Sequence, residues 1–274
     1  MKYIEDKDYK YHDILGKHLR SYNLKYTGNR EFSSEYFYAI KDNVLVGAIY
    51  TNLFWDWVNI DSLFYKDKEA LKKLISEIKL FYLNRAVGIK FITEVESDFQ
   101  NFKKLGFELV GKMEGTPKTP RSFHMRNVNF EVENNNQKDI IYATEKINYY
   151  DSIVQEQIDK FNKENNINNL QEKDMIFVAI EDSDFAGGIQ INITEDSMYI
   201  NRLVVNEVYR GNRIGTKLMN IIEEKAKSLG VYSISTGTVE FQAKEFYEKQ
   251  GYEVVMIKEN DPKGFDSYKL TKKL

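Results

Sequence analysis

The chain has 274 residues, of which 42% are hydrophobic and 30% are charged, and it contains no cysteine. This composition is typical of a globular protein with two moderate cores, and it excludes disulfides, thiolate nucleophiles and cysteine metal sites. The net charge of −3 argues against a broad surface for nucleic acid or an anionic membrane, and the sequence shows no secretion signal or membrane span, so a cytoplasmic location is expected.

An internal repeat runs through the chain with its landmarks in the same order. The matching segments are 38–47 with 178–188, 60–63 with 200–203, 106–110 with 251–255, and Pro117-Lys118 with Pro262-Lys263. Each copy reads as helix, antiparallel strands, helix, strand, helix, strands. The repeat therefore predicts two similar domains of mixed α/β structure.

An aromatic segment in the first copy places Trp55 and Trp57 around Asp56. Two interpretations are open. The segment could form an apolar wall with an anionic point for a cationic amine, or it could pack in a core or a domain interface. We favour packing, because aromatic clusters usually fill space.

The segment 133–138 is polar and lacks helical or alternating periodicity, which is typical of a linker. We therefore expect one domain in residues 1–132 and a second in 139–274. The alternative is a loop inside one large domain.

In the second copy the pattern predicts strands at 175–180, 185–193 and 198–205, a helix over 214–229 that ends at Gly230, a strand at 231–239 and a short helix over 241–250 closed by Gly251. Between the third strand and the first helix lies the run LVVNEVYRGNRIGTK, residues 203–217. Free amides at a helix start, the helix dipole and nearby glycines favour an anion such as a phosphate.

This strand, followed by YRGNRIGT, an amphipathic helix, a second strand and FYEKQGY, resembles the GNAT acetyltransferase superfamily. The resemblance implies two tandem GNAT-like domains with α/β (α+β, mixed sheet) folds, and acetyl-CoA as acyl donor without a metal. It also implies a donor site made by Leu203, Val204, Val205, Arg210, Gly211, Asn212, Arg213, Ile214, Gly215, Thr216, Lys217 and Phe246. Within it the Val205 amide would face the thioester carbonyl, and Tyr247 would meet the departing thiolate.

Arg213 departs from the family pattern, in which a glycine is usual at this position. An arginine is tolerated in ordinary helical backbone but is strained at positive φ. We expect ordinary helical backbone, because Arg213 lies inside the predicted helix start.

The first copy lacks both features of the donor site. Residues 64–69 (FYKDKE) replace the phosphate loop with acidic residues, and Phe102 falls opposite Tyr247. We therefore expect residues 1–132 to form a GNAT-like domain without its own cofactor, which acts as scaffold, substrate wall or recognition surface.

The base that takes the proton of the attacking amine is left unassigned, with water a candidate. The three histidines, His12, His18 and His124, all fall in the first copy. In the second copy Glu207 and Glu240 are the nearest carboxylates, and we expect both to be solvated surface charges.

The predicted function is an N-acetyltransferase that moves an acetyl group from acetyl-CoA to a primary amine by direct attack in a ternary complex. The acceptor would be a small molecule or a peptide, with no nucleic acid or membrane as partner. The alternative is a non-catalytic acyl-CoA-binding sensor or an interaction module. Two fused copies can substitute for a two-fold dimer, so a monomer with pseudo-dimeric domains is expected rather than a homodimer.

Overall fold

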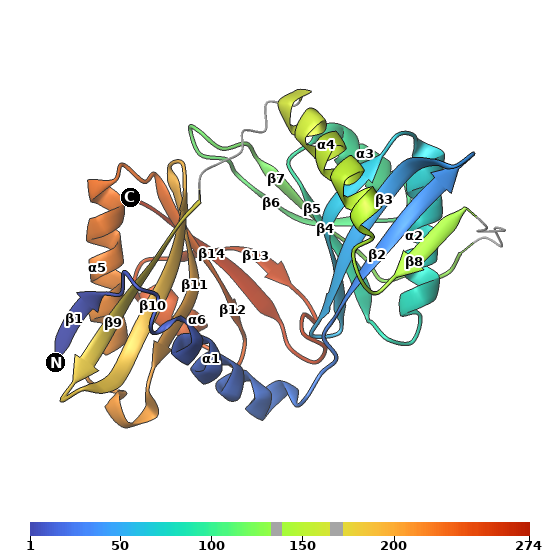
Figure 1. The fold of residues 1–274 in the computed structure, drawn as a ribbon. Coiled ribbons are helices and arrows are strands. Elements are labelled where there is room, and N and C mark those ends of the chain that lie inside the picture. Colours follow the sequence, from blue (N-terminus) through green and yellow to red (C-terminus); the bar gives the residue numbers. More distant parts are fainter. Residues whose placement is uncertain (133–138, 165–171) are drawn as a thin grey trace.

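The computed structural model describes residues 1–132, 139–164 and 172–274. They form two mixed sheets of seven strands each, which confirms the predicted α/β fold class (Figure 1). The first sheet has the order β6 (Glu108–Met113), β7 (Ser122–Asn127), β5 (Gly88–Thr93), β4 (Trp57–Tyr65), β3 (Val44–Phe54), β2 (Ser33–Lys41), β8 (Ile140–Ala143). The second sheet has the order β13 (Glu253–Lys258), β14 (Ser267–Lys273), β12 (Ser233–Val239), β11 (Ser197–Val205), β10 (Asp184–Thr194), β9 (Glu172–Glu181), β1 (Lys2–Glu5).

The helices are α1 (His12–Thr27), α2 (Lys68–Tyr82), α3 (Glu96–Lys104), α4 (Asn148–Glu164), α5 (Ile214–Ser228) and α6 (Lys244–Lys249), with a short 3-10 helix η1 (Glu207–Tyr209). The strands and helices predicted for the second copy all form, with boundaries that differ by up to three residues. Helix α5 ends as predicted before Gly230, which has φ +70°. No helix of the described residues is both long and apolar enough to cross a membrane.

The two sheets exchange their first strand and first helix. Strand β1 pairs with β9, and Leu15 of α1 is fully buried against Ile176, Val178 and Val204 of the second sheet. In return, β8 pairs with β2, and α4 packs on the first sheet (Figure 1). With this exchange both sheets have the same strand order, with one parallel pair each, β4 with β5 and β11 with β12.

The predicted linker 133–138 lies outside the described residues. The division into 1–132 and 139–274 stays a prediction, but the sheets do not follow it, because each takes a strand and a helix from the other side of residue 133.

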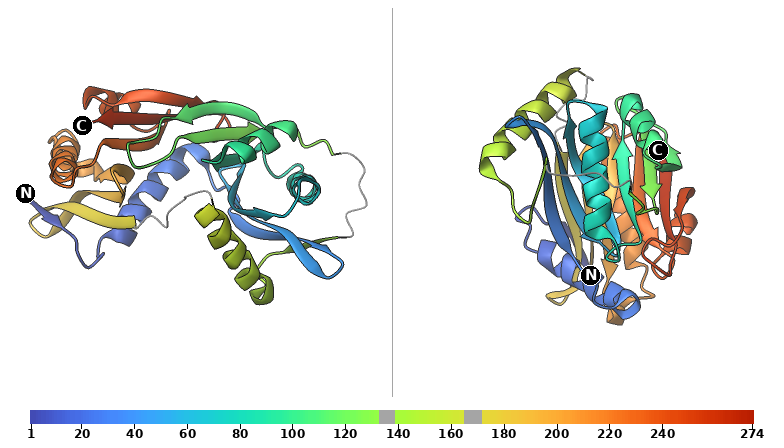
Figure 2. Two further views of the ribbon diagram at one scale, coloured as in Figure 1. Left: turned by 90° about the horizontal axis from the view of Figure 1, so that it is seen from above. Right: turned by 90° about the vertical axis from the view of Figure 1, so that its right-hand side faces the viewer.

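The two sheets adjoin along their edge strands β6 and β13, which lie side by side, and both chain termini lie at the end of the molecule formed by the second sheet (Figure 2). Met256 of β13 packs directly over Gly111 of β6, where a Cβ atom would come within 2.8 Å of the methionine side chain. Glycine is therefore required for this approach of the two edges.

The exchange makes a testable prediction about α1. Replacing Leu15 with alanine is expected to lower the free energy of unfolding by about 3 kcal/mol, because a fully buried leucine is truncated. Hydrogen exchange measured by mass spectrometry should increase in β9 to β11 and not in β2 to β4. The matched control Ile153→Ala on α4, which packs on the first sheet, should show the reverse pattern. Faster hydrogen exchange of β2 to β4 in the Leu15 variant would contradict the packing of α1 on the second sheet.

Candidate active site

An open seam divides β11 from β12. Their parallel pairing ends where Ile200 meets Thr236, although β11 continues to Val205 and β12 to Val239. Asn206 N donates to Ala186 O at 3.0 Å, and Val205 lies opposite Gly187 in β10. Because hydrogen-bonded and non-hydrogen-bonded pairs alternate in an antiparallel ladder, the main-chain groups of Val205 turn away from β10 and towards the seam.

Helix α5 begins beside this seam without a side-chain cap. Gly215 in its first turn faces Phe246 and Val205: a Cβ atom there would lie 3.3 Å from the Phe246 ring. The corresponding helix of the first sheet, α2, is capped, since Asp67 accepts a hydrogen bond from Ala70 N at 2.8 Å. The amides at the start of α5 are therefore available to an anion, whereas α2 already holds a carboxylate.

The expectation for Arg213 is wrong. The residue is the N-cap of α5, with φ +56° and ψ +23°, in the left-handed region. The preceding loop residue Gly211 also has positive φ, +83°. The chain must reverse its direction between the loop and the helix, and this turn places Arg213 before the helical backbone rather than within it. A side chain in this region costs about 1 kcal/mol or more.

Replacing Arg213 with glycine is therefore expected to raise the free energy of unfolding by about 1 kcal/mol, because glycine adopts positive φ without steric cost. Urea denaturation of the two proteins measures the difference. Asp182→Gly is a matched control in the β9–β10 turn, where φ is +46°, and it should show a gain of the same sign. A loss of stability in Arg213→Gly alone would contradict the assignment of strain to this residue.

A cleft of about 980 Å³ opens along the seam. Of the predicted donor-site residues, those that line it are Leu203, Val204, Val205, Arg210, Gly215, Phe246 and Tyr247. The others, Gly211, Asn212, Arg213, Ile214, Thr216 and Lys217, belong to the loop and to the first turn of α5, outside the lining. The Ile214 side chain is buried in the core, so only its main chain could meet a ligand.

Tyr247 lies on α6, with its side chain almost fully buried at the cleft. Burial raises its pKa to about 12, and a hydrogen bond with the Thr236 side chain opposes this shift. Thr236, at the point where the seam opens, was not predicted from the sequence. In the first sheet Phe102 is fully buried and stacks on Phe91 with ring centroids 4.0 Å apart.

Because α1 packs on the second sheet, it brings a histidine to the cleft. The repeat had predicted this histidine in the other domain. His18 on α1 lines the cleft, and His12 lies 3.3 Å from Arg202 of β11. Nothing in the sequence assigns α1 to the second sheet, so this was missed. Glu207 is exposed, and pairing with Lys25 lowers its pKa.

The aromatic segment divides between the two predicted roles of packing and wall: Trp57 packs between the sheets, whereas Trp55 lines the cleft. Trp57 is buried, and its Nε1 donates to Asn260 O at 2.8 Å across the interface. Asp56 forms an ion pair with Arg30, so its charge is already matched. Trp55, at the tip of the β3–β4 hairpin, lines the cleft.

Residues 138–252 match the model of the acetyltransferase (GNAT) family. Residues 138–252 thus carry the match to the GNAT family that the motifs had predicted. A comparison with curated proteins returned no match.

Among solved structures, the chain is similar to an acetyltransferase from Bacillus cereus ATCC 14579, with 28% identity over 44% of this chain and 92% of the other, and a TM-score of 0.40. It is similar to the aminoglycoside 6'-N-acetyltransferase from Enterococcus faecium, with 22% identity over 46% and 82% of the two chains and a TM-score of 0.34. A third similar structure is the PaiA N-acetyltransferase from Thermoplasma acidophilum in complex with coenzyme A, with 24% identity over 47% of this chain and 80% of the other, and a TM-score of 0.32.

Proposed function

We propose that the protein is an N-acetyltransferase that transfers an acetyl group from acetyl-CoA to a primary amine held in the same cleft. The observation that carries this proposal is that one cleft combines an outward-facing main-chain NH at Val205, an uncapped helix start at α5 and the hydroxyl of Tyr247. The family match of residues 138–252 supports it independently.

In this proposal the diphosphate of the donor lies on the amides of 211–216, near the positive charges of Arg210 and Lys217; the Arg210 amide itself donates to Glu207 O at 3.2 Å. The pantetheine arm lies along Leu203 to Val205, where the Val205 NH faces the seam and can pair with it; the Val205 carbonyl accepts a hydrogen bond from Arg210 Nε at 3.4 Å. The Val205 NH then stabilises the negative charge that develops on the thioester oxygen.

The reaction itself is direct attack. The amine nitrogen forms a bond with the thioester carbonyl carbon, the C–S bond breaks, and the thiolate leaves with the electron pair. Tyr247 donates a hydrogen bond to the sulfur. The pKa of Tyr247 is about 12, whereas a thiol has a pKa of about 8.5, so complete proton transfer from the tyrosine to the thiolate is unfavourable. The main contribution of Tyr247 is therefore the hydrogen bond. The amine proton leaves to water.

The two fused halves support the prediction of a monomer, and the capped helix start of α2 supports a first half without its own donor site.

Acetyl-CoA is expected to raise the melting temperature of the wild-type protein and to release free CoA with at least one member of a panel of primary amines. Saturation at 100 times the Kd corresponds to about 2.7 kcal/mol of stabilisation. Gly215→Glu should abolish both effects, because the new carboxylate enters the space beside Phe246 and repels the diphosphate. Asn220→Glu, at an exposed position of the same helix, is the control for an added charge. A thermal shift without CoA release from any amine would favour an acyl-CoA sensor, and no shift at all would favour an interaction module.

A further inference from the structure

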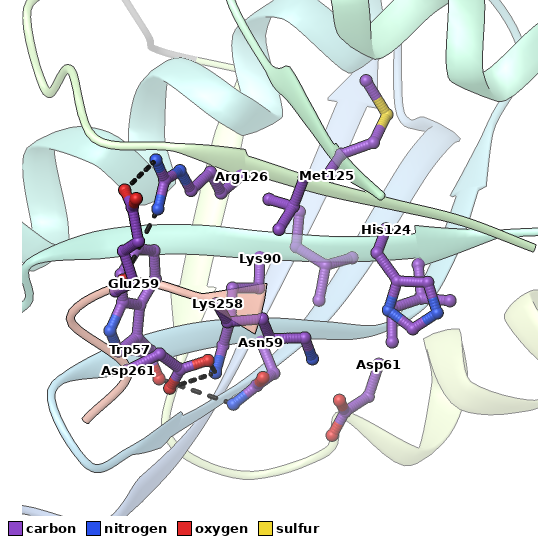
Figure 3. A pocket seen from close by; sticks show the side chains of 13 residues that line it. Trp57, Asn59, Asp61, Lys90, His124, Met125, Arg126, Lys258, Glu259 and Asp261 are labelled. Carbon is purple, nitrogen blue, oxygen red and sulfur yellow. Dashed lines mark hydrogen bonds and ion pairs between the residues drawn. The ribbon is translucent and has the colours of Figure 1, made fainter. Parts of the chain in front are cut away.

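The cleft meets a second cavity at the junction of the two sheets. This second cavity, of about 390 Å³, is lined by β4, β5, β6 and β7 of the first sheet and by the end of β13 with the loop after it. Lys90, Lys258 and Asp261 line both spaces. Figure 3 shows Lys90 beside the carboxylate of Asp261, with His124 on the other side of the cavity. The second cavity and the cleft therefore share lining residues, and the first half of the chain forms one wall of the second cavity.

Two lysines at this junction lack an ion pair, although the carboxylate of Asp61 also lines the second cavity. Lys90 Nζ lies 2.9 Å from both carboxylate oxygens of Asp261, so this pair is neutral. Lys258 on β13 and Lys269 on β14 have no ion-pair partner among the residues that the structure describes; the Lys269 ammonium instead lies 3.9 Å from the centre of the Tyr199 ring. Both lysine side chains are partly buried, and burial lowers the pKa of each, that of Lys269 to about 7.

A buried histidine, His124, lines the second cavity. His124 is 7% exposed, and its Nδ1 has no hydrogen-bond partner within the described part of the chain. Burial and the charges of Lys258 and Lys269 lower its pKa to about 3, so the ring is neutral near pH 7 and adds no further positive charge to this wall.

These lysines lie away from the proposed diphosphate site. The loop 206–213 follows β11, whereas β14 and β13 are two and three strands farther across the sheet. At about 4.8 Å per strand the separations are about 10 and 14 Å. An anion bound between these two lysines would pair with their ammonium groups and favour the charged form, which burial disfavours.

We propose that the acceptor amine carries an acidic group, a carboxylate or a phosphate, that binds Lys258 and Lys269 where the cleft meets the second cavity. This inference rests on the proposed function, because it names the class of acceptor for that transferase. It gives the first half a role as the wall of the acceptor site, through Lys90 and His124. It also disfavours polycationic acceptors, which would meet like charges there.

Two pairs of primary amines test the proposal and separate its two anionic groups. Glycine is compared with glycinamide, and 2-aminoethyl phosphate with ethanolamine, by CoA release from acetyl-CoA. In at least one pair the acidic amine is expected to have a kcat/KM at least tenfold above its neutral partner. Lys258→Met and Lys269→Met together should remove this preference and leave the Kd of acetyl-CoA unchanged. Lys273→Met, exposed on the same strand as Lys269, is the control and should keep the preference.

Equal or better turnover of the neutral amines, a preference that survives the double variant, or a loss of acetyl-CoA affinity in that variant would each overturn the proposal. If no amine releases CoA, the proposed function fails, and calorimetry decides the acidic site separately. Binding of glycine or 2-aminoethyl phosphate to the wild type but not to the double variant would support the site, and no binding to either would overturn it.

Discussion

Replacing Tyr247 with phenylalanine is expected to lower kcat by about 10- to 100-fold and to leave the Kd of acetyl-CoA unchanged. The hydroxyl is almost fully buried at the cleft, and a hydrogen bond to a charged group contributes about 1.5 to 3 kcal/mol, which corresponds to this range of rate. The ring itself packs in the core of the second sheet and stays in place in the variant, so stability should change little.

Stopped-flow measurement of CoA release separates the chemical step from binding, and thermal shifts with acetyl-CoA check the donor site. Thr236→Val is the matched comparison. It removes the side chain that hydrogen-bonds the Tyr247 hydroxyl but keeps that hydroxyl, so a smaller loss of kcat is expected. Unchanged turnover in Tyr247→Phe would remove this residue from the reaction, and a large loss of acetyl-CoA affinity would make it a binding residue instead.

Replacing Lys269 with methionine is expected to stabilise the protein by about 2 kcal/mol at pH 7. Burial, with a further contribution from Lys258, lowers the pKa of Lys269 from 10.5 to about 7, and such a change corresponds to at most about 5 kcal/mol. Because the side chain is partly exposed, solvent screening reduces this value. Methionine keeps the length and the contact with the Tyr199 ring without a charge.

The gain should depend on pH with a definite sign. The unfolded chain holds the proton of Lys269 up to its ordinary pKa, whereas the folded protein releases it near pH 7. The wild-type protein is therefore penalised fully below pH 7, and the penalty disappears as the pH rises towards 10.5. Lys258 of β13, Tyr199 of β11 and His124 of β7 face the same ammonium and remain in both proteins.

Urea denaturation of both proteins between pH 6 and pH 10 measures this difference. Lys273→Met is the control, because an exposed lysine on the same strand should show no such dependence. A destabilised Lys269→Met would show that the ammonium has a partner in the folded protein, and a difference that does not change with pH would show that its pKa is not lowered there. An acidic acceptor would supply the anion that Lys269 lacks in the free protein. This would explain why a destabilising lysine lines the cleft.

The local features of the second half were predictable from its sequence. The apolar strand, the glycines and the periodic helix after residue 213 depend on interactions between residues close in the chain, and they predicted the order of β11, α5, β12 and α6. The loss of the phosphate loop in the first half was also predicted, from the acidic residues in 64–69, and the structure adds that the Asp67 carboxylate caps the start of α2. Arg213 was not, since its backbone conformation depends on the path of the loop before the helix.

The sequence by itself determined two repeated α/β units, one of them with the glycines and the tyrosine of a GNAT domain. Only the tertiary structure decided that β1 and α1 complete the second sheet while β8 and α4 complete the first. The physical reason is that the two units are similar, so either edge strand and helix carries the hydrophobic pattern that either sheet needs, and local propensity does not distinguish them. The same long-range packing brought His18 to the cleft, and Lys90 and His124 beside Lys258 and Lys269, where residues more than a hundred positions apart make one site.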